Sequence, residues 1–388
     1  MKFTVSVCLL LAALSLIVVT GPACKKTVTK TVTDTLRHAW QPVPLINNYA
    51  NAALSSYNAG DSILAVGGSF NLIQVPVKTF NNLMGFYLPG TTIVQPTYVA
   101  PYIDGAAICF VTATTLYVES NPPHDQYSVL SYTPQYTPGE YSIFKQVCIY
   151  PSQSYPGTDY PLVRDRYALT PVESVGAGNK QARFDLIYFD SAKLLSPFAL
   201  GDTPHVKRLI LQADPTTIGF ISSNYFCAAF YDKFFVSYGG QFFRIDTAGN
   251  VKGFGYSPAP YPKNFGTANM FQYGNTLFAN FSGVFYASTD RGETWTLFND
   301  FTGTTAGLLT YRMVGNDLYG TLGDLDMQIW KVAISGNTLD FSELNNDGLQ
   351  SNLVTSLTKC GPYVFATTPT GVFYRDTAYF NQLKTPIR

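Results

Sequence analysis

The sequence predicts an all-β protein, folded as a β-propeller of about seven four-stranded blades. No segment after residue 40 repeats its apolar residues with the 3.6-residue period of a helix. Short runs rich in Val, Ile, Tyr, Phe and Thr alternate instead with Gly, Asn, Asp and Pro, as expected of short strands and tight turns. One such unit recurs every 41–46 residues, which is the length of a propeller blade.

The first 23 residues are expected to be a signal peptide. Lys2 precedes the apolar stretch Cys8–Val19, which has the length of the hydrophobic core of a secretion signal and is too short to cross a bilayer with ease. The residues Gly-Pro-Ala-Cys that end at Cys24 resemble a bacterial lipobox, with Gly21 at the position where Leu is common. The resemblance implies cleavage before Cys24 and acylation of this cysteine. An ordinary secretory signal and an uncleaved anchor are the alternatives.

Residues 24–35 are expected to form a lipidated N-terminus and a flexible leash. The stretch after Cys24 is polar and has no periodic apolar face, so it should stay extended and solvated. Stable anchoring needs more than one acyl chain, which a multiply acylated N-terminal cysteine supplies. Lys25 and Lys26 favour a periplasm-facing position, because acidic residues at this place accompany surface display in lipoproteins of the Bacteroidota type. We therefore expect an exported lipoprotein of the outer or the inner membrane.

Residues 36–388 form the predicted propeller. A turn followed by an alternating apolar strand is easily seen four times, and the aligned aromatic residues Phe235, Phe278, Tyr319 and Phe365 are 43, 41 and 46 residues apart. Six or eight blades are alternatives to seven, because the 68 residues from Tyr167 to Phe235 have room for an insertion or another blade. The copies are residues 232–237, 275–280, 316–321 and 362–367, with weaker copies at 61–66, 115–118 and 166–169.

The strand that follows each copy is also recognisable, at residues 240–246, 283–288 and 371–376. Alternation along these strands sends one set of side chains into each interface between blades, which accounts for most of the 27 Tyr and 28 Phe residues. Trp40 is expected to belong to an early outer strand that joins the first and last blades, because closure of the ring removes exposed sheet edges.

One turn carries a motif that has a name. Residues 288–295, Ser-Thr-Asp-Arg-Gly-Glu-Thr-Trp, fit the pattern Ser-x-Asp-x-Gly-x-Thr-Trp at every fixed position. The motif resembles the Asp-box, or BNR repeat, of propellers in sialidases, sortilin-type receptors and photosystem II assembly factor-like proteins. Its expected chemistry is structural: the Asp carboxylate accepts backbone N–H groups of the turn, Gly adopts a positive φ, and Trp inserts between sheets. The fixed positions are Ser288, Asp290, Gly292, Thr294 and Trp295, and residues 375–380 look like a decayed copy.

No catalytic residue, metal site or cofactor is predicted. The nearest match to the Phe/Tyr-Arg-Ile-Pro motif of sialidases is residues 243–246, which lack the proline and lie in mid-chain. The three histidines, His38, His124 and His205, are widely separated, and no nucleophile, zinc or phosphate-loop motif occurs. Residues 324–326 and 345–348 carry oxygen ligands without the full spacing of a calcium loop, so hydrated turns are favoured there.

Charge and cysteine content exclude some classes of function. Lys and Arg (25) balance Asp and Glu (25), and the pI is about 6.8, so nucleic acid is not an expected partner. Four cysteines lie beyond the targeting segment, and free buried thiols are favoured over disulfides. Cys109 and Cys227 both lie eight residues before the aromatic residue of a following strand, which suggests one repeated core position. The other two cysteines are Cys148 and Cys360.

Loops that combine Tyr with Pro are the strongest candidates for ligand binding. Tyr on a stiffened loop offers contact area at low entropic cost, which suits a sugar or a protein surface. Plain propeller connections are the alternative. The candidate residues are Tyr132, Tyr136, Tyr141, Tyr155 and Tyr160.

These observations favour a membrane-anchored, non-enzymatic binding or scaffolding lipoprotein of a bacterial cell envelope. Its expected partners are an envelope protein or a glycan, and the membrane through the N-terminal lipid. A glycan-processing enzyme, sialidase-like or another glycoside hydrolase with a carboxylate pair, is the alternative. A purely structural subunit of a larger envelope assembly is a third possibility.

Overall fold

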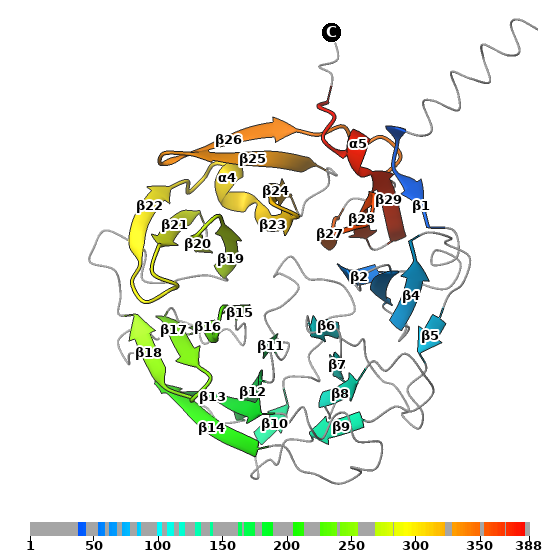
Figure 1. Cartoon of the computed structure of the whole chain (residues 1–388). Helices are drawn as coiled ribbons and strands as arrows, with labels where there is room; N and C mark the ends of the chain where they lie inside the picture. Colours follow the sequence, from blue (N-terminus) through cyan, green and yellow to red (C-terminus); the bar gives the residue numbers. More distant parts are fainter. Residues whose placement is uncertain are drawn as a thin grey trace, which may run out of the picture.

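The computed structural model describes residues 38–43, Val77, the strands between residues 53 and 212, and the ranges 226–238, 241–254, 268–281, 283–322, 328–349, 353–368 and 370–384. Within this part of the chain the strands form seven antiparallel sheets, arranged radially about one axis (Figure 1). The prediction of an all-β propeller with about seven blades is therefore confirmed. Among the described residues no helix has both the length and the apolar composition of a membrane span.

Five sheets each consist of four strands that follow one another in the chain, every strand pairing with the next. The first two are β2 (Ala53–Asn58), β3 (Ser62–Gly67), β4 (Leu72–Pro76), β5 (Met84–Phe86), and β6 (Val99–Tyr102), β7 (Ala107–Val111), β8 (Leu116–Ser120), β9 (Val129–Tyr132). The other three are β15 (Phe226–Phe230), β16 (Lys233–Tyr238), β17 (Gln241–Asp246), β18 (Val251–Phe254); β19 (Ala268–Tyr273), β20 (Thr276–Phe281), β21 (Val284–Ser288), β22 (Thr296–Asp300); and β23 (Thr310–Val314), β24 (Asp317–Thr321), β25 (Ile329–Ser335), β26 (Thr338–Glu343). The short helix α4 (Thr305–Leu308) precedes β23.

Two sheets depart from this simple order. One has the order β10-β12-β13-β14, with β11 also paired to β12. Its strands are β10 (Glu140–Ser142), β11 (Leu162–Arg164), β12 (Tyr167–Ser174), β13 (Gln181–Tyr188) and β14 (His205–Gln212). The other has the order β1-β29-β28-β27 and is followed by helix α5. Its elements are β1 (Gln41–Pro42), β27 (Ser356–Cys360), β28 (Tyr363–Thr368), β29 (Gly371–Asp376) and α5 (Thr377–Phe380).

The sheet that contains β1 closes the ring. Gln41 and Pro42 pair with Tyr374 and Phe373 on β29, so an N-terminal strand lies outermost in the blade built by the end of the chain. Trp40, next to this strand, is only 2% exposed and packs edge-on against Phe380 of α5, with ring centroids 5.8 Å apart. The predicted outer strand at Trp40 is confirmed.

Most of the repeated copies occupy the same position in their blades. The four strong copies are β16, β20, β24 and β28, and the recognisable following strands are β17, β21 and β29. The weaker copies at 61–66 and 166–169 correspond to β3 and β12. In the described chain the long interval before Phe235 holds β13, β14 and β15 and no additional sheet, so the interval does not add a blade.

The weak copy at 115–118 does not occupy the second strand of its blade, although the repeat predicts this position. It lies in β8, the third strand of its sheet, whereas the equivalent second strand is β7. The proposed equivalence of Cys109 and Cys227 fails for the same reason, because Cys109 lies in β7 and Cys227 in the first strand β15. Two residues eight positions apart can lie on the two facing strands of either hairpin of a blade. This spacing therefore does not identify which hairpin the residues belong to. Cys360 ends strand β27 and is fully buried.

Aromatic and aliphatic side chains fill the interfaces between neighbouring blades. One cluster joins Phe235 and Phe242 of the β15–β18 sheet to Leu277, Phe281 and Tyr286 of the β19–β22 sheet. Another joins Phe271, Phe278 and Phe285 to Leu318 and Val332 of the next sheet. The high aromatic content of the sequence is therefore used to hold blades together.

Candidate functional site

The turn of residues 288–295 connects β21 to β22 and is closed by the carboxylate of Asp290. Its Oδ1 atom accepts the backbone N–H groups of Glu293 (3.0 Å) and Thr294 (2.9 Å) and the hydroxyl of Ser288 (2.7 Å). The Thr294 hydroxyl donates to Oδ2 at 2.5 Å, and the Gly292 N–H donates to the Ser288 hydroxyl at 2.8 Å. These five residues are hydrogen-bonded within one turn, so their short spacing in the sequence suffices to form it.

Electrostatics keep Asp290 ionised. Desolvation raises the pKa of its carboxyl group, but hydrogen bonds from Thr294, Ser288 and Glu293 together outweigh that effect and hold the pKa well below its usual range. A carboxylate in this state accepts hydrogen bonds and does not deliver protons near neutral pH. Asp290 therefore has the chemistry of a fixed acceptor and lacks that of a general acid.

The same turn docks on the neighbouring blade. Gly292 has φ of +81°, and a Cβ atom there would lie 2.3 Å from Cζ of the fully buried Phe235. The ring of Trp295 packs edge-on against Phe235 and Phe242, with centroids 6.0 and 5.4 Å away. Glycine at 292 thus permits the close approach, and Trp295 fills the interface.

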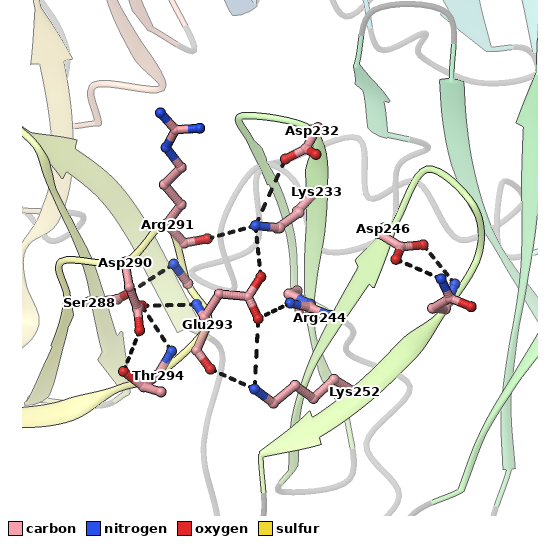
Figure 2. Close-up of polar contacts among 12 residues, drawn as sticks. Asp232, Lys233, Arg244, Asp246, Lys252, Ser288, Asp290, Arg291, Glu293 and Thr294 are labelled. Carbon is pink, nitrogen blue, oxygen red and sulfur yellow. Dashed lines mark hydrogen bonds and ion pairs between the residues drawn. The ribbon is translucent and has the colours of Figure 1, made fainter.

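Glu293 adds ion pairs to this contact between blades (Figure 2). Its carboxylate pairs with Lys233 at 2.9 Å, with Arg244 and, more loosely, with Lys252 at 3.8 Å, and these three cations lie on β16, β17 and β18. Lys252 also donates to the carbonyl oxygen of Glu293 at 2.8 Å. The hydrogen bond from Lys233 is the largest contribution to a lowered pKa of Glu293, which desolvation opposes and the charges of all three cations support.

Sequence reasoning missed this ion-pair cluster. Glu293 occupies a variable position of the motif. Arg244 belongs to residues 243–246, which were considered above only as the nearest match to the sialidase motif. In the structure Arg244 faces Glu293, and Asp246 accepts the backbone N–H and side-chain amide of Asn250, both at 2.8 Å. No signal in the sequence pairs Glu293 with three cations that precede it by 41 to 60 residues, because the pairing requires two blades to lie side by side.

The decayed copy in the last blade has different contacts. Arg375 is 1% exposed, and its guanidinium donates to the carbonyl oxygen of Asn345 and to the Gln382 amide oxygen. Burial lowers the pKa of this guanidinium, while the charge of Asp347 raises it. The Asp347 carbonyl oxygen also accepts the backbone N–H of Trp40 at 2.8 Å. Backbone oxygens of the 345–348 turn, considered above as calcium ligands, thus bind an arginine and the N-terminal segment.

Several predicted site residues are only partly covered by the structure. Tyr132 ends strand β9 and Tyr141 lies in strand β10, so these two belong to strands and not to the expected loop. Tyr136, Tyr155, Tyr160 and Cys24 lie outside the described residues. Within the described ranges, no three His, Cys, Asp or Glu side chains gather as metal ligands would.

Comparison with known proteins gives the fold. No protein-family model and no curated protein match the sequence. A chain of a mitotic checkpoint complex aligns with a TM-score of 0.51, at 9% identity, over 87% of this chain and 93% of its own length. A Bacteroides uniformis protein described as a 6-phosphogluconolactonase aligns with a TM-score of 0.51, at 11% identity, over 86% of this chain and 93% of its own length.

A third similar structure is the extracellular domain of a B. thetaiotaomicron protein described as a one-component system. It has a TM-score of 0.50 and 11% identity, and the alignment covers 87% of this chain and 40% of that one. This chain therefore spans less than half of that domain. At identities of 9–11% these likenesses show a shared architecture alone, so the function has to be inferred from the residues of this chain.

Proposed function

We propose that the chain is a non-enzymatic scaffolding propeller that binds a protein partner and is held at a bacterial envelope membrane through acylated Cys24. One observation carries the non-enzymatic part. The fixed residues of the single recognisable motif, and the ion-pair cluster of Glu293 with three cations, are engaged in contacts within the turn and between blades. On this proposal the 288–295 turn is an Asp-box with a structural role.

The place where the chain enters the ring supports a scaffold. Strand β1 lies at the outer edge of its sheet, and α5 lies at the same rim (Figure 1). Trp40 packs against Phe380 of α5. A tether attached here leaves the two flat faces of the propeller accessible to a partner. The lysines after Cys24 favour a periplasm-facing position of this lipoprotein.

The anchoring proposal is tested by replacing Cys24 with Ser in the full chain, expressed in a bacterium that processes lipoproteins. The wild-type chain should incorporate an alkyne-labelled fatty acid and sediment with membranes, whereas Cys24→Ser should do neither. Cys8→Ser is a matched control, because it alters a cysteine of the signal peptide and should leave both results unchanged. Equal membrane fractionation of wild type and Cys24→Ser would exclude the lipid anchor.

The binding proposal is tested by crosslinking in intact cells, followed by affinity purification from detergent extracts. A partner protein recovered in fixed ratio to the chain is the expected result. Recovery of polysaccharide without protein would show that the partner is a glycan and not a protein. Turnover of glycan substrates by the purified chain would overturn the non-enzymatic proposal.

A further inference from the structure

One tight turn has an aromatic residue where its counterparts have glycine. The first and second strands of four blades are joined by turns whose leading residue has a positive φ. In three of them this residue is glycine: Gly274 (+59°), Gly315 (+65°) and Gly361 (+56°). In the β15–β16 turn it is Tyr231, with φ of +56°. A side chain is disfavoured in this conformation, so the tyrosine ring is retained at a cost that glycine would avoid.

The residue that contacts Tyr231 is strained in the same way. Arg291, in the 288–295 turn of the next blade, has φ of +60°, and its guanidinium carbon lies 5.3 Å from the centroid of the Tyr231 ring. Within the described ranges Tyr231 and Arg291 are the two non-glycine residues with positive φ. Two strained residues from neighbouring blades therefore meet in one cation–π contact.

In the described part of this region, the Arg291 guanidinium is the cation that has no carboxylate partner. Lys233, Arg244 and Lys252 all face Glu293, whereas Arg291 contributes only its carbonyl oxygen, which accepts from Lys233 at 3.5 Å. Its side chain is exposed and points away from Glu293 (Figure 2). Among the residues that the structure describes, no carboxylate forms an ion pair with it; Asp232, beside Tyr231, lies 3.9 Å from Lys233 instead.

We propose that the Tyr231–Arg291 pair is an anchor for a single Asp or Glu side chain of a protein partner. This inference rests on the proposed function and names the chemistry of its partner. The hydrogen bonds around Asp290 fix the turn, and the Tyr231 ring supports the guanidinium, so little freedom is lost when its N–H groups donate in parallel to a carboxylate. Arg and Tyr are also the side chains that dominate protein interfaces.

The flanking charges select the kind of partner. Asp232 is 70% exposed and Glu293 is 41% exposed, and they lie on either side of Lys233. A polyanionic glycan or nucleic acid laid along this surface would meet both carboxylates. An isolated acidic side chain on a protein meets only Arg291, so the local charges favour it.

The test is selection of random 12-residue peptides, displayed on phage, against the full chain in detergent. Peptides that contain Asp or Glu should be enriched, and replacement of that residue by Asn or Gln should weaken binding about tenfold. Arg291→Ala should weaken binding of the selected peptides about tenfold, the effect of losing one charge-assisted hydrogen-bonded pair. Lys331→Ala is the matched control, since it removes an exposed cation in another blade and should change affinity less than twofold.

A second variant shows whether a loss of peptide binding comes from loss of the anchor or from misfolding. Tyr231→Gly places at this turn the residue that its three counterparts use. It relieves the positive φ but removes a partly buried ring that packs against the cluster of Phe235, so thermal unfolding should stay near that of wild type while peptide affinity should fall. Absence of acidic peptides, equal binding to Arg291→Ala, or competition by polygalacturonate but not by peptides would overturn the inference. If Arg291→Ala still captures the cellular partner at wild-type levels, the anchor is refuted and the scaffold stands. Capture of no protein by any variant refutes the scaffold itself.

Discussion

Two blades begin their third strand with the same four residues and then differ. Gly-Val-Phe-Tyr occurs at 283–286 and again at 371–374. In the β19–β22 blade Ala287 and Ser288 follow, and the chain turns around Asp290 and returns as the outer strand β22 of the same blade. In the last blade Arg375 and Asp376 follow, the chain enters α5, and the outer strand β1 comes from the N-terminal segment.

The difference separates local from remote stabilisation. The hydrogen bonds of Asp290 and Ser288 that close the 288–295 turn join residues at most four positions apart. In the last blade Asp376 caps α5 by accepting the Ala378 N–H at 2.8 Å, but Arg375 reaches back to Asn345, and the site of the missing fourth strand is covered by residues 40–42. A blade closed by two distant segments should depend on each of them more than a blade closed by one turn.

The largest expected effect is at the remote closure. Trp40→Ala should lower the free energy of unfolding by about 3–5 kcal/mol, because the indole is 2% exposed and packs in the cluster that includes Leu344, Val364 and Phe380. Denaturant unfolding of the two chains measures the loss. Trp295→Ala is the matched control, and its half-buried ring should cost less. Equal losses would show that the two blades depend on their tryptophans alike.

The same contrast explains what the sequence could predict. Patterns with a short range, such as the strands at Phe278 and Phe365 and the hydrogen bonds of Asp290, are encoded in adjacent residues, and the sequence predicted them. The ion pairs of Glu293 and the hydrogen bond from Arg375 to Asn345 join residues 30 to 60 positions apart, so no local pattern reports them. The mistaken strand at 115–118 arose where the copy was weakest and one hairpin resembled the next.

An intermediate effect is expected for the buried arginine. Arg375→Ala should destabilise the chain by about 2–3 kcal/mol, because it leaves the Asn345 carbonyl and the Gln382 amide without their donor in a buried place. Lys331→Ala, which removes an exposed ion pair with Asp317 at 3.2 Å, should cost at most about 0.5 kcal/mol. Urea unfolding of both variants decides whether Arg375 is a structural member of the closure. A loss no greater than that of the surface variant would argue against this role.

The smallest effect, with the most specific signature, concerns the local turn. Asp290→Ala should cost about 1 kcal/mol at pH 7, comparable to the loss of a helix N-cap, because the carboxylate is exposed and its partners regain water. Desolvation raises the pKa of Asp290, but hydrogen bonds from Thr294 and Ser288 outweigh it. The pKa is therefore lower in the folded chain than in the unfolded one. The unfolded chain therefore binds the proton more readily, and acid weakens the wild-type fold at this site.

The pH dependence of this variant distinguishes the turn from the remote closure. The stability difference between wild type and Asp290→Ala should be constant from pH 8 to about pH 5 and should shrink as the pH falls below about 4, the ordinary pKa of an aspartate. Asp317→Ala serves as a control for general acid effects. Urea unfolding between pH 3 and 8 measures all three chains. A difference that disappears already near pH 6, or that grows in acid, would mean that Asp290 does not act as the ionised acceptor of its turn.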